Sequence, residues 1–581
     1  MDRKNFIQFL VISAVILAAW YGAMMIFGLG KPPQRPVPRQ GQEPVPAQGQ
    51  DETPVAPSDG TIGPAPAQAP QVPLKTGIVR ENGTLRVSFT NLGAALERVQ
   101  LLNYRAPYFE EVEGEKARPV LTLVRDFQTG RLSDVVETVV FRRGGGEFSE
   151  EVPTDDIVYE IKDTLSNPLV FEGIVRDRRT GEPRLKIRKT VTLPPEGYHF
   201  DVKLEFINPT DEPLKFDFAL RGAAGIEQEM PRRPGVGTVV GYRDGNGYDV
   251  DHVPAITVGK KGDKENENPQ IAWAGAANQY FVAMTSPPEH ADWLKSVVSR
   301  IVTDSDMLKR RGRWGEGTLA PKQERSRASL ARNKATVVLR SVTRELGPGA
   351  QLTHEYQFIC APKMASVLDP YGRGVQQVVK YGWPPSVGAV LLAILRFFYG
   401  FTRNYGVAIL LMTVVVRLVL HPLTRKSQVG MRRMQLLQPK IAELKRKYGD
   451  DRERFTREQM ALFKKYGAHP LGGCWPMLLQ FPVLIALFST LRSAFELRQA
   501  GFIPGWIEDL SQADTIFRLP FYVPLISTNA VNVLPFLFVT ASFVSQHMMP
   551  KPTDPQAQQQ QKIMRWMPLF FAFILYNYAS G

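Results

Sequence analysis

One arginine, Arg417, lies well inside an apolar run that extends from Asn404 to Thr424. A run of about 20 apolar residues predicts a membrane-spanning helix, and an ionised side chain inside one costs roughly 2.5 to 3.5 kcal/mol. Thr413 and His421 lie four residues to either side of Arg417, so the helix would carry one polar stripe. Such a stripe usually faces a bundle interior or a water-filled cavity. We therefore interpret Arg417 as a functional charge in a hydrated site.

The alternative interpretation of Arg417 is snorkelling, in which a long side chain carries its charge to the lipid headgroups. At about 1.5 Å per residue, Arg417 is roughly 12 Å from the basic pair Arg425 and Lys426, a distance that a stretched arginine just reaches. This helix alone leaves both interpretations open. Gln480 lies between apolar neighbours in the segment 471–491 and adds a polar position in a neighbouring span, which favours the hydrated site.

The segment 424–469 is hydrophilic and carries thirteen lysine and arginine residues against five acidic residues. A short loop this basic is predicted to be cytoplasmic under the positive-inside rule. Apolar residues recur at helical spacing on both sides of a break at 448–451, which predicts a two-helix hairpin. The role of this hairpin is either topology and lipid contact or the reception of a partner or nascent chain. The residues that we expect to make its contacts are Arg432, Arg433, Lys445, Arg446 and Lys447.

The net charge of +14 raises the question of a nucleic-acid partner. Much of the excess lies in the hairpin, and the basic clusters elsewhere lack interleaved aromatic residues, so no specific nucleic-acid site is predicted. The two cysteines, Cys360 and Cys474, provide no disulfide framework or zinc cluster. The residues 77–365 show no metal-ligand spacing, Gly-rich phosphate loop or nucleophile elbow; their histidines are His199, His252, His290 and His354. We predict no cofactor and no enzymatic activity.

The first 76 residues are predicted to tether a domain to the membrane. Residues 1–30 contain a long apolar run after a short charged start, which indicates an uncleaved transmembrane anchor with its amino terminus in the cytoplasm. A cleaved signal peptide is the alternative. Residues 31–76 are rich in proline, glutamine and alanine and have few large apolar side chains, so they are predicted to be a semi-extended linker.

Residues 77–365 alternate between apolar and polar side chains, as in Leu85, Val87 and Phe89. Many such short runs, separated by turn signals such as Asn82-Gly83, predict an antiparallel β-sandwich outside the cytoplasm. Lys189 interrupts one otherwise apolar face. A saccharide-binding or saccharide-processing site in this domain stays open as an alternative function.

Residues 366–403 include an amphipathic helix, which we expect to lie along the outer membrane surface; a short span is the alternative. Residues 404–581 are predicted to form the membrane core. Together with the anchor, this part gives five predicted spans, whose apolar runs are 6–29, 404–424, 471–491, 531–549 and 563–581.

Several ordered motifs resemble the YidC-type membrane protein insertases of Gram-negative bacteria, over nearly the whole architecture. They are VVVRLVLHPLT at 414–424, LQPKI at 437–441, HPLGGCWPMLLQFPVLIALF at 469–488, FELRQA at 495–500 and TDPQAQQQQKIMRWMP at 553–568. The resemblance implies a multi-domain protein of the inner membrane, with an α-helical transmembrane bundle and a periplasmic antiparallel β-sandwich similar to sugar mutarotases. It implies insertion of nascent membrane proteins without ATP, metal or covalent chemistry.

The resemblance also implies roles for particular residues. Arg417, Thr413 and Gln480 match positions in a hydrophilic groove that is open to the cytoplasm and to lipid. The hairpin 424–469 resembles the region that engages nascent chains and helps to contact the ribosome or targeting machinery. The periplasmic domain of the family is thought to contact the Sec translocon.

The chain departs from the family pattern at its end, where the family has a sixth span and a basic tail; we expect a truncated sequence. Two other functions remain as alternatives. An anion-handling transporter would use Arg417 as an anion site, and a membrane-anchored saccharide-binding protein would use the domain 77–365. Neither alternative accounts for the basic hairpin beside the arginine-bearing span.

Overall fold

The structure is a computed structural model, in which the chain separates into two compact units, Met1–Pro70 and Gln71–Gly581. The predicted anchor and nearly all of the linker lie outside the described residues. The structure describes residues 72–580 except 107–109, 113–114, 126–132, 144–147, 163–166, 178, 225, 227–235, 246, 268–269, 290, 303–333, 380, 382–383, 449–450, 467–474, 524–527, 548–564, 574–575 and 577–579.

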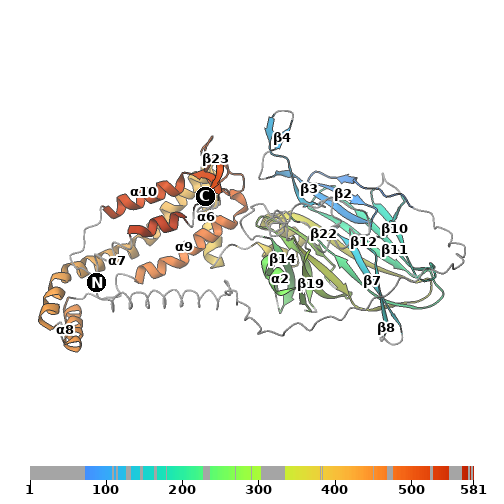
Figure 1. The fold of residues 1–581 in the computed structure, drawn as a ribbon, viewed down its shortest axis with the longest axis horizontal. Coiled ribbons are helices and arrows are strands. Elements are labelled where there is room, and N and C mark those ends of the chain that lie inside the picture. Colours follow the sequence, from blue (N-terminus) through green and yellow to red (C-terminus); the bar gives the residue numbers. More distant parts are fainter. Residues whose placement is uncertain are drawn as a thin grey trace, which may run out of the picture. The chain divides into compact units, whose positions relative to one another are not determined.

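The second unit begins with a large antiparallel β domain (Figure 1). Its nine-stranded sheet has the spatial order β15 (Gly247–Pro254), β14 (Gly237–Asp244), β17 (Ile271–Ala277), β18 (Phe281–Ser286), β22 (Gln351–Pro362), β12 (His199–Ile207), β11 (Pro183–Thr192), β10 (Leu169–Arg176) and β9 (Glu160–Ile161). Its seven-stranded sheet comprises β16 (Lys264–Asn266), β19 (Leu294–Val302), β20 (Lys334–Ser341), β13 (Leu214–Arg221), β7 (Val135–Arg143) and β8 (Phe148–Pro153), with β21 (Arg344–Leu346) paired to β13.

Three smaller sheets contain the other described strands. A four-stranded sheet joins β1 (Ile78–Glu81), β2 (Leu85–Thr90), β3 (Ala95–Arg105) and β6 (Val120–Arg125). The two hairpins pair β4 (Glu110–Val112) with β5 (Glu115–Ala117), and β23 (Thr515–Val523) with β24 (Thr528–Asn532).

The alternating residues build one core between the sheets. In β2, Leu85, Val87 and Phe89 are fully buried, as the two-residue period predicts. Phe206 of β12 and Phe218 of β13 meet across the two large sheets, with ring centroids 4.7 Å apart. The shared core confirms the predicted antiparallel sandwich, since each sheet hides its apolar face against another sheet.

Lys189, which interrupts the apolar face of β11, points into this core. Its Nζ lies 2.7 Å from Oδ2 of Asp134 and donates to the carbonyl of Ala94 at 3.0 Å. The hydroxyl of Tyr356 donates to the other carboxylate oxygen of Asp134 at 2.7 Å. A buried charge is tolerated when it is paired and hydrogen-bonded, so this exception to the pattern is an ion pair inside the sandwich.

A short helical segment covers the outer face of the nine-stranded sheet. It contains α5 (Ala365–Leu368) and the 3₁₀ turns η2 (Asp369–Tyr371) and η3 (Val375–Val378). Among its described residues, the domain also contains the helix α2 (Ala255–Lys261). The indole of Trp273 donates to the carbonyl of Arg373 at 3.1 Å. Gly374 has a φ of +66°, and a Cβ there would lie 2.2 Å from Tyr248, so the close approach requires glycine. This segment gives the chain a fixed exit from the sandwich.

The remaining chain is mainly helical (Figure 1). Its described helices include α6 (Pro385–Thr402), α7 (Tyr405–Tyr448), α8 (Arg452–Lys465), α9 (Trp475–Ser493), the 3₁₀ turn η4 (Phe495–Leu497) and α10 (Leu534–His547). Residues 565–573 are helical as well. Among the described residues, α6 and the part of α7 from Tyr405 to Pro422 are long and apolar enough to cross a membrane. The five-span count and the surface location of α6 stay predictions.

Helix α7 differs from expectation in its length. The sequence predicts a span that ends near Thr424 and a separate hairpin arm, whereas one helix of 44 residues runs through both, with Pro422 and Pro439 inside it. Proline removes one backbone hydrogen bond, and the helix continues through both of these positions. The predicted break falls between α7 and α8, where the arms separate after Tyr448.

Candidate functional site

One face of α7 is held by its neighbours. Ala408 and Met412, four residues apart, are almost fully buried. They share a hydrophobic cluster with Leu395 of α6 and Ala486 of α9. Positions four apart lie on one face of a helix, so this cluster fixes the rotation of α7 against the other two helices. The positions of Thr413 and Arg417 follow from that rotation.

The polar stripe of α7 lies beside the packed face. The hydroxyl of Thr413 is half-buried and donates to the carbonyl of Ile409 at 2.8 Å. The side chain of Arg417 is exposed, and it forms no hydrogen bond or ion pair with any residue that the structure describes. His421 is exposed as well. Thr413, Arg417 and His421 therefore recur along one continuous helix, and the described part of the protein does not neutralise the cation.

Exposed apolar side chains flank the stripe. Leu410, Val414 and Leu418 have exposed fractions of 56, 53 and 66 %. A soluble protein would hide such a run, whereas a helix in contact with lipid exposes it. A charge next to a lipid-facing surface needs water, a lipid headgroup or a bound anionic segment. Arg417 is thus available to a ligand from the membrane side or from water.

Gln480 was predicted to accompany Arg417. It lies in α9, one of the helices that pack against α7, but its side chain is outside the described set. The pairing of Gln480 with Arg417 in one groove therefore stays a prediction.

The two arms of the hairpin pack through a small apolar contact. Leu437 of α7 and Phe463 of α8 are buried against each other, with Ile441 beside them. Lys440 donates to the hydroxyl of Tyr466, and its Nζ lies 4.2 Å from the ring centroid. Among the described side chains, the apolar core of the hairpin is therefore small.

The five basic residues that were predicted to make the contacts of the hairpin all lie on α7. Arg446 and Lys447 are exposed, near the end of the helix. Arg432, Arg433 and Lys445 lie on the same helix, but their side chains are not described. Cations near a helix C-terminus also interact favourably with the helix dipole, so part of their role is structural.

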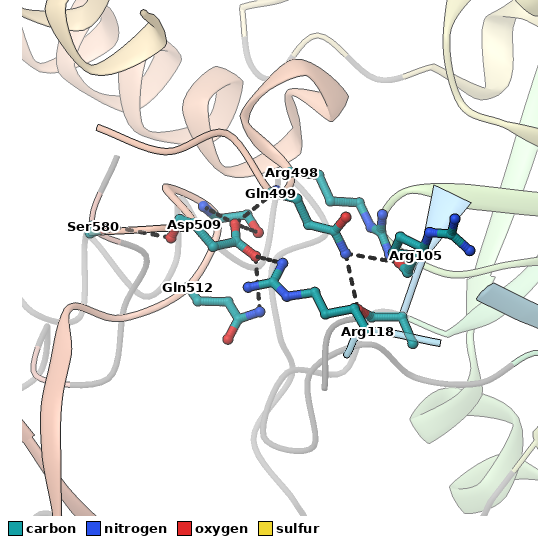
Figure 2. Close-up of polar contacts among 9 residues, drawn as sticks. Arg105, Arg118, Arg498, Gln499, Asp509, Gln512 and Ser580 are labelled. Carbon is teal, nitrogen blue, oxygen red and sulfur yellow. Dashed lines mark hydrogen bonds and ion pairs between the residues drawn. The ribbon is translucent and has the colours of Figure 1, made fainter. Parts of the chain in front are cut away.

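A polar centre that the sequence did not indicate lies in the loop after α9 (Figure 2). The carboxylate of Asp509 is nearly buried and accepts hydrogen bonds from its own loop. Its donors are the backbone N–H of Gln499 at 2.9 Å, the backbone N–H and hydroxyl of Ser511 at 2.9 and 2.6 Å, and the side-chain amide of Gln512 at 2.9 Å. Arg118 approaches the same carboxylate at 3.8 Å. A single carboxylate thus organises the loop 498–512.

The same loop contacts the sandwich directly. Arg498 donates to the carbonyl of Arg105 at 2.6 Å, and the side chain of Gln499 donates to the same carbonyl at 2.8 Å (Figure 2). The ring of Phe495 packs edge-on against Tyr104 and Phe281, with both centroid distances 5.4 Å. The motif at 495–500 therefore joins the helical part to the β domain. Its mixture of aromatic and polar residues was the available signal, but the spacing does not reveal the partner.

No described residues form a group of three or more histidine, cysteine and acidic side chains that could hold a metal ion. Cys360 is buried in β22, where burial raises the pKa of its thiol and makes the reactive thiolate scarce. The chemistry offered by the described site is therefore the display of a fixed cation beside an apolar surface.

Comparisons with known proteins extend this picture. The family model described as 60Kd inner membrane protein matches residues 397–581, and the YidC periplasmic domain model matches residues 78–393. A membrane protein insertase YidC from Geotalea uraniireducens is 30 % identical over 98 % of this chain and 94 % of its own length. Another from Syntrophus aciditrophicus is 28 % identical over 85 % of this chain and 79 % of its own.

A galactose mutarotase-like structure from Lactobacillus casei covers 49 % of this chain and 99 % of its own, at 12 % identity. Its TM-score of 0.29 is too low to carry an argument.

The β domain, the apolar helices and the matched regions define an inner-membrane protein with a large periplasmic domain. The chain belongs to the YidC family of membrane protein insertases. This membership confirms the function predicted from the motifs. The comparisons support that function and not the anion-transporter or saccharide-binding alternatives.

Proposed function

We propose that this protein moves nascent transmembrane segments from the cytoplasm into the inner membrane along the polar stripe of α7, where Arg417 attracts the polar tail of the client. The observation that carries the proposal is the exposed Arg417 guanidinium, which has no partner among the described residues. An ionised side chain in a membrane-spanning helix costs free energy, so we expect Arg417 to bind a ligand.

The physical account has two steps. A client must carry its polar and often acidic outer tail across hydrocarbon; a hydrated groove shortens the low-dielectric path, and a fixed guanidinium attracts the passing carboxylates. Its apolar residues then leave sideways into lipid past the exposed face of Leu410, Val414 and Leu418, and their partition drives insertion. In this scheme Thr413 and Gln480 line the groove with Arg417. The process needs no ATP, metal or covalent intermediate.

The hairpin 424–469 receives the client on the cytoplasmic side in this proposal. Arg446 and Lys447 are exposed there, and we expect Arg432, Arg433 and Lys445 of the same helix to take part in client contact. Such a surface suits acidic segments of ribosomal or targeting proteins and anionic lipid headgroups. The proposal includes no specific nucleic-acid site.

The proposed topology is multi-pass, with the amino terminus in the cytoplasm and the sandwich in the periplasm. The sandwich is proposed to contact the Sec translocon, and the protein works either alone or with it. The loop 498–512 is placed on the periplasmic side by this topology. Its contacts with Arg105 and Arg118 support that placement, because they join it to the sandwich.

Site-specific crosslinking to a stalled nascent membrane protein tests the client path. A photoreactive residue at position 413, 417 or 480 of the full-length protein is expected to capture the client. Val419 is the matched control, since it is exposed and lies about 200° around the helix from Arg417. Equal capture from position 419 and position 417 would refute a path along the stripe.

A further inference from the structure

The hairpin formed by β23 and β24 exposes large apolar side chains near its base. Thr515 pairs with Asn532 and Phe517 with Val531, so the register shifts by one residue at Ile516. Ile516 and Phe517 are 55 and 54 % exposed. The described protein therefore leaves both apolar side chains at this shift largely uncovered.

The composition of the hairpin is unusual for a loop in water. Residues 515–532 read TIFRLPFYVPLISTNAVN, in which Arg518 is the one charged residue. Exposed apolar strands at a sheet edge promote aggregation unless something covers them. Arg518 is itself exposed next to Phe517, so the hairpin combines a cation with large apolar side chains. This combination is typical of segments that lie in the membrane interface.

The base of the hairpin is fixed to the start of α10. The carboxylate of Asp514 accepts the backbone N–H groups of Val533 and Leu534 at 2.7 and 2.6 Å. Thr515 donates to the side-chain carbonyl of Asn532 at 2.9 Å, which closes the hairpin base. A carboxylate at the first amides of a helix satisfies its unpaired donors and interacts favourably with its dipole. The hairpin therefore cannot move independently of the end of α10.

The first five residues of α10 include exposed apolar side chains as well. Phe536, Leu537 and Phe538 are 59, 51 and 45 % exposed. In the topology of the proposed function, these residues lie where α10 enters the outer leaflet. The exposed apolar surface of the hairpin is thus continuous with the end of α10 that faces lipid in this topology. This continuity indicates that the bilayer covers the hairpin.

We propose that the β23–β24 hairpin is a membrane anchor, which holds Ile516 and Phe517 at the boundary between headgroups and acyl chains of the outer leaflet. The anchor rests on the proposed function, because it requires α10 to span the membrane. It holds the loop that carries Asp509 at the membrane surface, since residues 509 and 514 belong to one short segment. The partner is lipid of the bilayer itself.

Spin-label accessibility tests the anchor in the full-length protein, reconstituted in vesicles of phosphatidylethanolamine and phosphatidylglycerol. Cys360 and Cys474 are replaced by serine or alanine, and single labels are introduced through Phe517→Cys, Phe538→Cys and Glu508→Cys. Glu508 is the aqueous control because it is exposed in the neighbouring loop. Labels at 517 and 538 are expected to be relaxed mainly by oxygen, and the label at 508 mainly by a water-soluble nickel complex.

A label at 517 that is as accessible to nickel as the label at 508, while 538 remains in lipid, overturns the anchor alone. Nickel access at both 517 and 538 overturns the proposed topology together with the anchor. The variant Ile516→Cys repeats the measurement at the neighbouring exposed position, in case Phe517→Cys disturbs folding. Spin–spin broadening at 516 or 517 would indicate a second copy as the occupant and would also overturn the proposal.

Discussion

The guanidinium of Arg118 lies 3.8 Å from the carboxylate of Asp509, and both side chains are largely buried (Figure 2). Arg118 precedes β6 of the sandwich, whereas Asp509 belongs to the loop after α9. This contact and the bonds from Arg498 and Gln499 to Arg105 join the two parts of the chain at one place. The β domain is thus connected to the insertase core by specific polar contacts as well as by the covalent chain.

Asp509→Ala is expected to loosen the loop 498–512. The change removes the acceptor for Gln499, Ser511 and Gln512 and leaves donors unpaired, which costs about 2 to 4 kcal/mol of local opening free energy. Hydrogen exchange of the loop amides measures this effect. Glu508→Ala is the matched control, because its exposed carboxylate neighbours Asp509. Equal protection in the two variants would contradict the role assigned to Asp509.

Lys189→Met is expected to destabilise the sandwich by about 3 to 5 kcal/mol, because it leaves the carboxylate of Asp134 buried without its cation. The double variant with Asp134→Asn should recover part of the loss. Asparagine tolerates the positive φ of 52° at that position. Hydrogen exchange of β11 amides reports the change.

The control for this prediction is Lys186→Met on the same strand. Lys186 pairs with Glu172 at 3.0 Å but is 31 % exposed, so its loss should cost at most about 1 kcal/mol. A cost for Lys189→Met no larger than that for Lys186→Met would show that the core ion pair is not important for stability.

The sandwich is expected to lose stability as the pH falls from about 6.5 to about 4. Burial lowers the pKa of His354 to about 4, with a smaller opposing effect of Asp292. The ring packs 5.4 Å from Trp293 and 5.5 Å from Phe218, between centroids. The unfolded chain binds the proton on His354 more tightly than the folded protein does. His354 therefore contributes its full stabilisation at pH values above its unfolded pKa. This stabilisation, at most about 3 kcal/mol, is lost as the pH falls towards the folded pKa.

Thermal unfolding of the protein at several pH values measures this dependence. His354→Phe keeps an aromatic ring in the cluster and removes the titrating group, so its stability should fall less steeply over the same pH range. Parallel pH profiles for wild type and variant would assign the acid sensitivity to other groups.

Much of the fold follows from local periodicity. Two-residue alternation located β2, and four-residue spacing placed Thr413 and Arg417 on one stripe, because strand and helix geometry act over short distances. Long-range pairs could not be predicted in this way. Arg498 donates to a carbonyl 393 residues earlier in the chain, and the spacing of neither segment encodes that contact. Lys189 was visible as an exception to its pattern, but its partner Asp134 depends on how the sheets stack.

The site was only partly predictable for the same reason. The polar stripe belongs to one helix, and its rotation is fixed by Ala408 and Met412 in the packed cluster. The role of Gln480 depends on how α9 is rotated at that position. The side chain of Gln480 is not among those that the structure describes.

Insertion into reconstituted vesicles tests the central role of Arg417 most directly. Wild type, Arg417→Ala, Arg417→Lys and the control Val419→Ala are compared with two clients that differ only in whether the translocated tail is acidic or neutral. Arg417→Ala should reduce insertion of the acidic-tailed client about tenfold, the effect of roughly 1.4 kcal/mol, and leave the neutral-tailed client nearly unchanged. Arg417→Lys should retain part of the activity. Equal insertion of the acidic-tailed client by wild type and Arg417→Ala would contradict the account.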